Sequence, residues 1–276
     1  MNIGICGLGV VGSAISHFFQ NARNRVQLCL YDKYKTEIND FKVLLQTDIL
    51  FVCLPTPFNE GTQTYNTDEL HELFERLHSA SYKGDILLKS TVDPEFCATL
   101  NNTYPSLLLI HNPEFLTARY ALEDFRTQQH VVLGSTVQSA HRLPILAGLH
   151  SSWFPHPITI SLTEAKYSSL MKIACNAFYA TKIQFFNELY QLCQATGMEY
   201  TTVQKLMTTT NEWLPLMHTH VPGPDGQLSF GGACLPKDTA ALLALCRRQA
   251  IEAPVIDATL EEQRAMRQEQ RAMRKA

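Results

Sequence analysis

Short apolar runs alternate with amphipathic segments along the first half of the chain. The apolar runs occupy residues 2–6, 26–31, 49–54, 85–89, 107–110 and 131–134. Their length and mainly apolar composition are typical of strands that are buried on both faces of a parallel sheet. Residues 13–20 and 68–78, which lie between such runs, have the pattern of helices. The alternation predicts a doubly wound α/β sheet in which the run at 131–134 is the last strand.

The second half of the chain has a helical pattern. Apolar residues recur at helical spacing through one long stretch, which Gly197 ends. Helices are predicted over residues 163–196, 200–208, 238–249 and 256–276. At 276 residues the chain is long enough for two domains. We therefore expect a sheet domain at 1–155, followed at 156–276 by a mainly α-helical domain built on the long central helix.

The predicted tail helix contains a near repeat. Residues 262–267 read Glu-Gln-Arg-Ala-Met-Arg, and residues 269–274 repeat the same letters. A seven-residue period places like residues on one face of a helix. That face could contact a partner helix or remain solvated, and the sequence leaves both interpretations open.

A glycine-rich turn follows the first predicted strand directly. Gly7, Gly9 and Gly12 have the spacing GxGxxG, and the second strand ends at Asp32, twenty residues after Gly12. In this context the first glycine makes a tight turn, the second admits a pyrophosphate, and the third lets the helix pack on the strand. The pyrophosphate would lie at the N-terminus of that helix. The combination of strand, glycines, helix, strand and acid predicts a Rossmann-like dinucleotide-binding fold.

Asp32 bears on the choice of dinucleotide. Its carboxylate would accept hydrogen bonds from a ribose diol and repel a 2′-phosphate, which favours NAD over NADP. Lys33 and Lys35, close to it in the sequence, would favour the opposite choice.

Polar loops follow three of the predicted strands. Thr56, Thr91 and Glu114 each come shortly after a strand ends. Because open α/β sheets bind ligands at the carboxyl ends of their strands, we expect these three residues to face one crevice. The candidate NAD contacts are Gly7, Gly9, Val10, Val11, Gly12, Asp32, Pro55, Thr56, Thr91 and Lys237.

The segment 230–238, Phe-Gly-Gly-Ala-Cys-Leu-Pro-Lys-Asp, has the composition expected around a nucleophile. Its paired glycines permit close backbone approach and positive φ. If a helix begins near Pro236, Cys234 lies at its amino end, where the helix dipole and Lys237 both favour the thiolate. The other cysteines lie mostly in apolar runs, where a buried thiol is ordinary packing. They are Cys6, Cys29, Cys53, Cys97, Cys175, Cys193 and Cys246.

Lys172 and Asn176 are a second candidate pair. They lie four residues apart in the predicted central helix and so share a face. Small and apolar residues surround them in the sequence, which favours a buried polar role over a solvated one.

Composition excludes several classes of function. A formal net charge of −3 gives no basic surface for nucleic acid. Eight cysteines without CxxC pairs or clustered histidines argue against a metal site or a disulfide framework. No apolar run reaches about 18 residues and the N-terminus lacks the pattern of a signal peptide, so we expect a cytoplasmic protein with no membrane span.

Taken together, these residues resemble the UDP-glucose/GDP-mannose dehydrogenase family, and most closely its UDP-glucose 6-dehydrogenase branch. The resemblance covers nearly the whole chain as a series of short blocks, which occur in the same order as in the family. The blocks are residues 7–12 with Asp32, then 53–57, 89–92, 112–116, 172–178 and 230–238. The resemblance implies NAD-dependent oxidation of a nucleotide sugar at C6, such as UDP-glucose to UDP-glucuronate.

The resemblance also implies roles in covalent chemistry. Cys234 resembles the nucleophile that captures an aldehyde as a thiohemiacetal and is then acylated as a thioester. Lys172 and Asp238 resemble groups that move protons and stabilise oxyanions, and Asn176 resembles a donor to the substrate and the oxyanion. A bound thiol adduct fits an alcohol-to-acid oxidation, because the aldehyde must stay in place between two hydride losses.

Hydrolysis of the thioester is assigned by the same resemblance. Glu114 resembles its general base, and Thr91 resembles the residue that holds the water. The candidate substrate contacts are Glu114, Phe115, Leu116, Lys172, Asn176, Phe230 and Gly231.

Two features differ from the family pattern. An acidic residue and a glycine usually follow Asn-Pro-Glu-Phe-Leu, whereas residues 117–119 here are Thr-Ala-Arg, so sugar contacts are expected to differ. Members also carry a third, Rossmann-like domain that grips the uridine diphosphate, whereas this sequence ends near Ala276 in what resembles the linker helix. Candidates for that grip are His218, His220, Pro222, Asp225 and Phe230. The family dimerises through its long central helix, which implies a homodimer through residues 163–196.

Two other functions remain open. One is a redox-neutral conversion with retained NAD, such as decarboxylation of UDP-glucuronate to UDP-xylose, which needs no thioester at Cys234. The other is a non-enzymatic protein that binds NAD and a partner chain through its helices.

Overall fold

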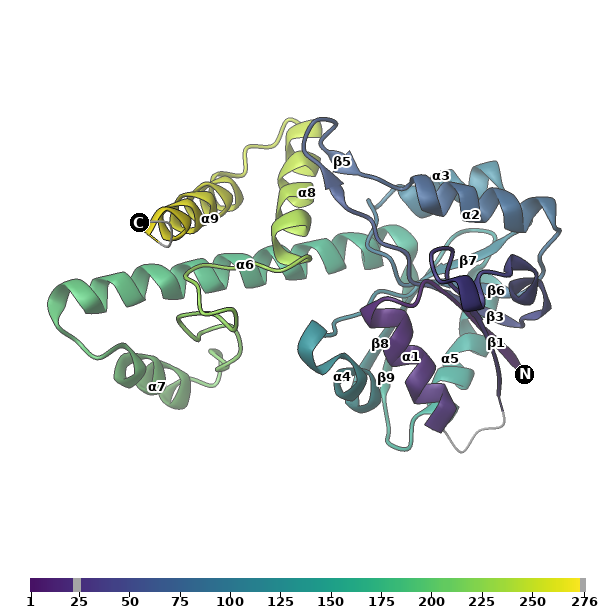
Figure 1. The fold of residues 1–276 in the computed structure, drawn as a ribbon, viewed down its shortest axis with the longest axis horizontal. Helices are drawn as coiled ribbons and strands as arrows, with labels where there is room; N and C mark the ends of the chain where they lie inside the picture. The colour runs from purple at the N-terminus through teal and green to yellow at the C-terminus, as the bar shows by residue number, and fades with distance from the viewer. Residues whose placement is uncertain (22–25, 274–276) are drawn as a thin grey trace. The chain divides into compact units, whose positions relative to one another are not determined.

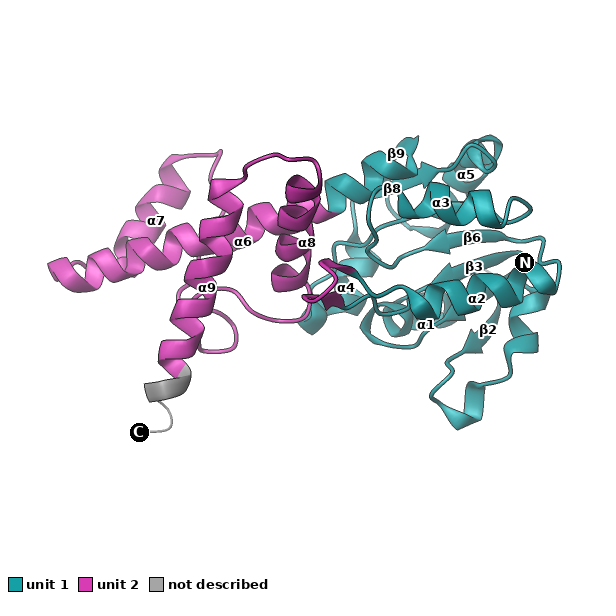
Figure 2. Ribbon diagram, turned by 90° about the horizontal axis from the view of Figure 1, so that it is seen from above, with its two compact units in different colours: residues 1–57, 65–172 teal, residues 58–64, 173–276 magenta. Residues whose placement is uncertain are grey.

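The structure is a computed structural model that describes residues 1–21 and 26–273, except for the side chains of 271–273. It contains two compact units, which Figure 2 colours separately. Unit 1 comprises Met1–Pro57 and Tyr65–Lys172, and unit 2 comprises Phe58–Thr64 and Ile173–Ala276. Each unit has its own hydrophobic core and is described by itself.

Unit 1 is built on a seven-stranded sheet with the order β2-β1-β3-β6-β7-β8-β9 (Figure 1). The strands are β1 (Asn2–Cys6), β2 (Gln27–Tyr31), β3 (Ile49–Val52), β6 (Asp85–Leu88), β7 (Leu108–His111), β8 (His130–Ser135) and β9 (Thr159–Glu164). The first five strands in the spatial order pair in parallel. The doubly wound α/β fold predicted from the apolar runs is confirmed.

The far edge of the sheet differs from the prediction. β8 pairs antiparallel with β7, and β9 pairs in parallel with β8 through six residue pairs beginning at His130 and Thr159. The run at 131–134 is therefore not the last strand. β9 was missed because its side chains are mostly exposed or half-buried, and an unbroken apolar run identifies only strands covered on both faces. For the same reason the long helix begins at Ala165, two residues later than predicted.

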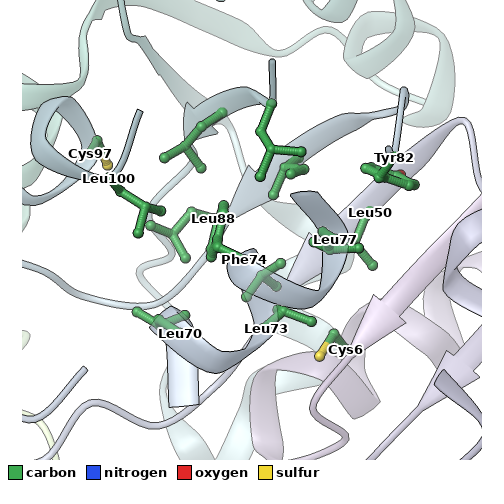
Figure 3. Close-up of a cluster of buried hydrophobic side chains, with 14 of the residues drawn as sticks. Cys6, Leu50, Leu70, Leu73, Phe74, Leu77, Tyr82, Leu88, Cys97 and Leu100 are labelled. Carbon is green, nitrogen blue, oxygen red and sulfur yellow. The ribbon is translucent and has the colours of Figure 1, made fainter. Parts of the chain in front are cut away.

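Helices cover both faces of the sheet. On one face Leu50 and Leu88 pack against α2 (Asp68–Ser79) and α3 (Phe96–Thr103), as Figure 3 shows. Figure 3 labels Leu70, Leu73, Phe74 and Leu77 of α2, which have helical spacing and lie on its buried face.

The opposite face is covered by α1 (Val10–Asn21), α4 (Ala121–Thr127) and α5 (Leu143–Trp153). Its core includes several aromatic side chains: Phe19 of α1 contacts Trp153 of α5 edge to face, with ring centroids 5.1 Å apart. Short 3-10 turns lie at Thr36–Ile38, Phe41–Gln46, Ala118–Tyr120 and Ala140–Arg142. The helices hold the carboxyl ends of the parallel strands in one row, which is where the predicted ligand loops begin.

Unit 2 is mainly helical, as predicted. Its helices are α6 (Ala165–Thr196), which begins in unit 1, then α7 (Tyr200–Thr210), α8 (Leu235–Arg248) and α9 (Pro254–Met273). The strands β4 (Phe58–Asn59) and β5 (Thr64–Tyr65) form a small hairpin, and its residues Phe58–Thr64 belong to unit 2. The last residues of the predicted tail helix, 274–276, lie outside the described residues.

The division into units differs from the predicted boundary between residues 155 and 156. β9 is hydrogen-bonded to β8, so the residues from 159 onward remain with the sheet. The first turns of α6 also belong to unit 1, up to Lys172. A boundary inside a continuous helix leaves no composition change or loop that sequence reasoning could detect.

One buried ion pair fixes the amino end of β6. Asp85 is 3% exposed, and its carboxylate accepts two hydrogen bonds of 2.8 Å from Arg142. We expect Arg142→Met to lower the free energy of unfolding of unit 1 by about 3 kcal/mol, because it leaves a buried carboxylate unpaired. Urea unfolding followed by the fluorescence of buried Trp153, in a Trp213→Phe background, measures this.

Arg126→Met is the matched control. Arg126 also grips a carboxylate with two donors, but that carboxylate, Glu123, has a 57% exposed side chain. Its loss should change the same free energy by less than about 1 kcal/mol. Equal effects of the two substitutions would show that burial of Asp85 does not decide the outcome.

Candidate functional site

The glycine turn has the geometry that a dinucleotide requires. Gly7 has φ of +89°, in the left-handed region, and an added Cβ on Gly12 would lie 1.9 Å from the Gly7 carbonyl oxygen. Nothing lies within 4 Å of the Cβ position of Gly9, so the space above it is open. Helix α1 begins at Val10, directly after this turn. The residues fit a pyrophosphate at the N-terminus of α1, held by backbone amides.

The ribose end of this site is also organised. The Asp32 carboxylate accepts a hydrogen bond of 2.8 Å from the Leu8 amide, which ties the end of β2 to the glycine turn. The two lysines that could attract a 2′-phosphate have other partners. Lys33 pairs with Glu72 at 2.6 Å, and Lys35 donates to the Leu8 carbonyl oxygen at 2.7 Å. The arrangement favours the unphosphorylated ribose of NAD.

The loops after β3 and β6 lie together, as predicted. The Thr56 hydroxyl donates to the Thr91 carbonyl oxygen at 2.6 Å, and the Ser90 hydroxyl donates to the Leu54 carbonyl oxygen at 2.7 Å. Pro55, on the same loop, is exposed. Two of the predicted NAD contacts are therefore fixed to each other at the carboxyl edge of the sheet.

The loop after β7 brings a carboxylate and a cation together. The Lys172 ammonium lies 3.8 Å from the Glu114 carboxylate and 4.9 Å from the centre of the Phe115 ring. Both charged side chains are largely buried, at 5% and 13% exposure. The second oxygen of Glu114 accepts a hydrogen bond of 2.6 Å from the Leu116 amide. A fixed carboxylate beside a cation is an arrangement that can orient a water molecule and exchange its proton.

Lys89 and Asn112, which the sequence reasoning gave no role, support this loop. The Lys89 ammonium donates to the Asn112 side-chain oxygen at 3.1 Å and to the Pro113 carbonyl oxygen at 3.3 Å. Burial lowers the pKa of Lys89 to about 8, and the positive charge of Lys172 acts in the same direction. The available signal was a lysine that directly follows the apolar residues 86–88.

In unit 2, Cys234 occupies the position that the sequence predicts. It is exposed and is the N-cap residue of α8, whose first turn contains Pro236. Gly232 has φ of +78°, and an added Cβ on Gly231 would lie 2.8 Å from the Arg267 guanidinium. Positive φ is thus confirmed at Gly232, whereas the close neighbour of Gly231 is a side chain and not the backbone that was predicted.

A fully buried carboxylate lies one turn further along α8. Asp238 is 0% exposed, and its two oxygens accept hydrogen bonds of 2.6 Å from the Asn176 amide and of 2.6 Å from the Lys237 ammonium. Lys237, predicted as an NAD contact, thus pairs with Asp238 inside unit 2. Cys234, Asn176, Lys237 and Asp238 form one cluster of predicted residues.

The other predicted residues of unit 2 differ in exposure. Phe230 is 2% exposed, and its ring packs with Ala180, Leu243 and Leu260. Among the candidates for a diphosphate grip, Asp225 pairs with Arg267 at 2.6 Å.

His218 stacks on Tyr179 with ring centroids 4.5 Å apart. Burial lowers the pKa of His218, and the charge of Lys182 adds to that effect. His220 and Pro222 are exposed.

The predicted site residues therefore fall into a set in each unit. Helix α6 carries one member of each, because Lys172 ends unit 1 and Asn176 follows four residues later on the same face of the helix. Among the described residues, no three His, Cys, Asp or Glu side chains gather as metal ligands do. Nor does the described part of the chain include a helix with the length and hydrophobicity needed to cross a membrane.

Comparison with known families matches both parts of the chain. Residues 27–153 match the UDP-glucose/GDP-mannose dehydrogenase family, NAD binding domain. Residues 166–264 match the central domain of the same family.

Individual relatives agree with this assignment. The chain is 25% identical over 258 residues to the UDP-glucose 6-dehydrogenase of Rickettsia bellii, covering 92% of this chain and 56% of the relative. It is 26% identical to the GDP-mannose 6-dehydrogenase of Azotobacter vinelandii, covering 80% of this chain and 52% of the relative. It thus spans about half the length of these relatives. A UDP-glucose dehydrogenase from Pyrobaculum islandicum has the same fold, with a TM-score of 0.78 at 20% identity over 94% of this chain and 67% of the other.

Asp32 provides a test of the dinucleotide site. We expect Asp32→Ala to weaken NADH binding about tenfold, because a ribose hydroxyl loses its charged acceptor. NADPH binding should weaken less or improve, because the carboxylate that repels a 2′-phosphate is gone. Titration calorimetry with both nucleotides measures the ratio of affinities, and Glu37→Ala, a change of an acidic residue on a nearby turn, serves as the control. An unchanged NADH-to-NADPH ratio would contradict the assignment of Asp32.

Proposed function

The chain belongs to the UDP-glucose/GDP-mannose dehydrogenase family, and on that premise we propose that it oxidises a nucleotide sugar at C6, converting UDP-glucose to UDP-glucuronate. The observation that carries this proposal is an exposed thiol, Cys234, at the N-terminus of α8, one turn before the buried carboxylate of Asp238. A helix N-terminus favours the thiolate form of a cysteine, which is the nucleophilic form.

Oxidation of a primary alcohol to an acid removes two hydrides from its carbon. Each removal is accompanied by loss of a proton from an oxygen atom bound to that carbon. NAD, when bound, accepts the hydride that leaves C6 in each oxidation. We assign proton exchange at the C6 oxygen to Lys172 and Asp238, and stabilisation of its negative charge to Lys172 and Asn176. An ammonium and an amide that are held before the reaction stabilise an oxyanion without reorganisation.

The thiolate of Cys234 then adds to the aldehyde carbon. A bond forms between Sγ and C6, the aldehyde oxygen takes up a proton, and the product is a thiohemiacetal. Loss of the second hydride from C6 and of the hydroxyl proton leaves a thioester. The covalent bond keeps the aldehyde in the protein between the two oxidations.

Hydrolysis completes the proposed sequence. Glu114 takes a proton from a water molecule as the water oxygen attacks the thioester carbon, and the bond between C6 and Sγ breaks to release the acid and the thiolate. The short contact from the Leu116 amide and the charge of Lys172 orient this carboxylate. Thr91, whose carbonyl oxygen is fixed by Thr56, is assigned to the water.

We also propose that the protein forms a homodimer through α6. Phe178, Phe185 and Leu192 recur every seven residues along this helix and are 64%, 53% and 54% exposed. Large apolar side chains at seven-residue spacing form one stripe, which is typical of a helix that packs against another helix. A second copy of the chain supplies an identical stripe, as a twofold interface requires.

The thiol mechanism predicts the outcome of one substitution. Incubation of the protein with UDP-glucose and NAD should give about two NADH per sugar, and Cys234→Ala should lower the rate at least about 100-fold because no thioester can form. Cys246→Ala, a cysteine of the same helix, should leave the rate within about twofold. Product analysis by chromatography and NADH absorbance measure both quantities.

Parallel incubations with GDP-mannose and UDP-glucuronate complete the experiment. Faster oxidation of GDP-mannose than of UDP-glucose would show that GDP-mannose, and not UDP-glucose, is the preferred substrate. Formation of UDP-xylose from UDP-glucuronate without net NADH, undiminished in Cys234→Ala, would contradict the proposed reaction. Binding of NAD with no turnover of any of the three sugars would contradict the assignment as an enzyme.

The dimer has a separate test. Light scattering coupled to size exclusion should give twice the chain mass of 31.1 kDa. Replacement of Phe178 and Phe185 by Glu should give the monomer mass, because burying charged side chains at a helix interface is unfavourable. Val137→Glu, at a 93% exposed position of unit 1, should leave the mass unchanged. A monomer mass for the unaltered protein would contradict the proposal.

A further inference from the structure

The segment that leads to Cys234 is held from one side by α9. This approach segment, residues 225–230, is followed directly by the paired glycines. Gln263 donates to the Phe230 carbonyl oxygen at 3.3 Å, and Gln270 accepts from the Leu228 amide at 3.2 Å. Between them, Arg267 donates to the Ser229 carbonyl oxygen at 2.9 Å. Three polar side chains at positions i, i+4 and i+7 of one helix thus bind three successive backbone units.

Arg267 makes the most extensive of these contacts. Its other terminal nitrogen donates to the Asp225 carboxylate at 2.6 Å, so the guanidinium joins both ends of the approach segment. Its side chain is only 12% exposed. The guanidinium also lies against Gly231, where an added Cβ would be 2.8 Å from it. The planar fork of arginine suits a carboxylate and a carbonyl oxygen at once, which the single ammonium of lysine does not.

Helix α6 holds the same segment from another side. Ser229 is 2% exposed with φ of +62°, its amide donates to Asn187 at 2.7 Å, and its hydroxyl donates to Gln184 at 2.6 Å. A non-glycine residue in the left-handed region is retained only where its surroundings fix it. The backbone before the glycines is therefore determined by side chains of two helices.

The near repeat of the tail supplies two of these contacts. Gln263 and Gln270 are equivalent positions of the two copies, and Arg267 ends the first copy. All three face the approach segment, whereas Arg264 and Gln268 are exposed. We propose that α9 positions the nucleophile. Arg267 is a positioning residue that fixes the backbone of the approach segment, and this backbone places Cys234 at the N-terminus of α8. The role of Cys234 as nucleophile rests on the proposed function, whereas the positioning by α9 does not.

The reactivity of Cys234 toward iodoacetamide tests this proposal without any substrate. Alkylation rates of Cys234 and Cys246 are followed together by peptide mass spectrometry, and Cys246, on the same helix, corrects for global changes. In Arg267→Met the ratio of the Cys234 rate to the Cys246 rate should fall about threefold, because a displaced thiol loses the favourable charge of the helix end. Arg267→Lys should give an intermediate value, since lysine retains one of the two contacts.

Arg264→Met is the matched control, one turn earlier on the exposed face of α9. Arg264 has a 55% exposed side chain and approaches Glu60 at 3.8 Å, so its loss should leave the ratio unchanged. Circular dichroism verifies that each variant is folded. Should Arg267→Met prevent folding, Arg267→Lys and Gln263→Leu carry the test through the same ratio. An unchanged or higher ratio in folded Arg267 variants overturns the proposal.

Turnover separates this inference from the proposed function. If the protein oxidises UDP-glucose, Arg267→Met should lower kcat, because the thiol that forms the thioester is displaced. If no nucleotide sugar is oxidised, the proposed function fails while the alkylation ratio still decides whether α9 positions the thiol.

Discussion

The burial of one carboxylate constrains the arrangement of unit 2. Asp238 has no contact with solvent and lies in the first turn of α8, so its charge requires partners inside the protein. Asn176 of α6 and Lys237 supply them. The Asn176 bond fixes the amino end of α8 against α6, and the amino end of α8 is where Cys234 lies. Burial of this charge costs free energy that an apolar side chain at position 238 would avoid, which favours a chemical role for Asp238.

The same logic applies to the loop after β7 in unit 1. Glu114 and Lys172 are both largely buried, and a second lysine, Lys89, donates a hydrogen bond to the Pro113 carbonyl oxygen of the loop. Buried charges that are few and mutually paired restrict the conformations available to a loop, which keeps a carboxylate in place for proton transfer. The predicted site residues Glu114 and Asp238 are thus both held by buried electrostatic contacts at the ends of regular elements.

Sequence reasoning succeeded where one local rule decides the structure. The turn around Gly7, the close approach at Gly12 and the start of α8 beside Cys234 each follow from glycine, proline and capping preferences. It failed where the decisive partner is distant in the sequence. Edge strand β9 depends on pairing with β8, and Lys89 depends on a loop that follows it by more than twenty residues.

The near repeat of α9 belongs to the second group. Its period is visible in the sequence, but the target of Arg267 is a backbone segment about forty residues earlier, as the pairing with Asp225 shows. The sequence alone allows the repeated face to contact a partner helix or to remain solvated. In the structure, the polar side chains of this face instead form hydrogen bonds with the backbone of an irregular segment, whose groups no helix or strand pairs.

The most direct test of the central claim is to look for the covalent intermediate. Glu114→Gln should slow thioester hydrolysis, so rapid quenching after mixing with UDP-glucose and NAD should leave an acyl adduct on the peptide that contains Cys234. The account predicts that mass spectrometry finds this adduct at Cys234 and that hydroxylamine removes it. Release of UDP-glucuronate with no adduct on Cys234 at any quench time, or an adduct on another residue, would contradict it.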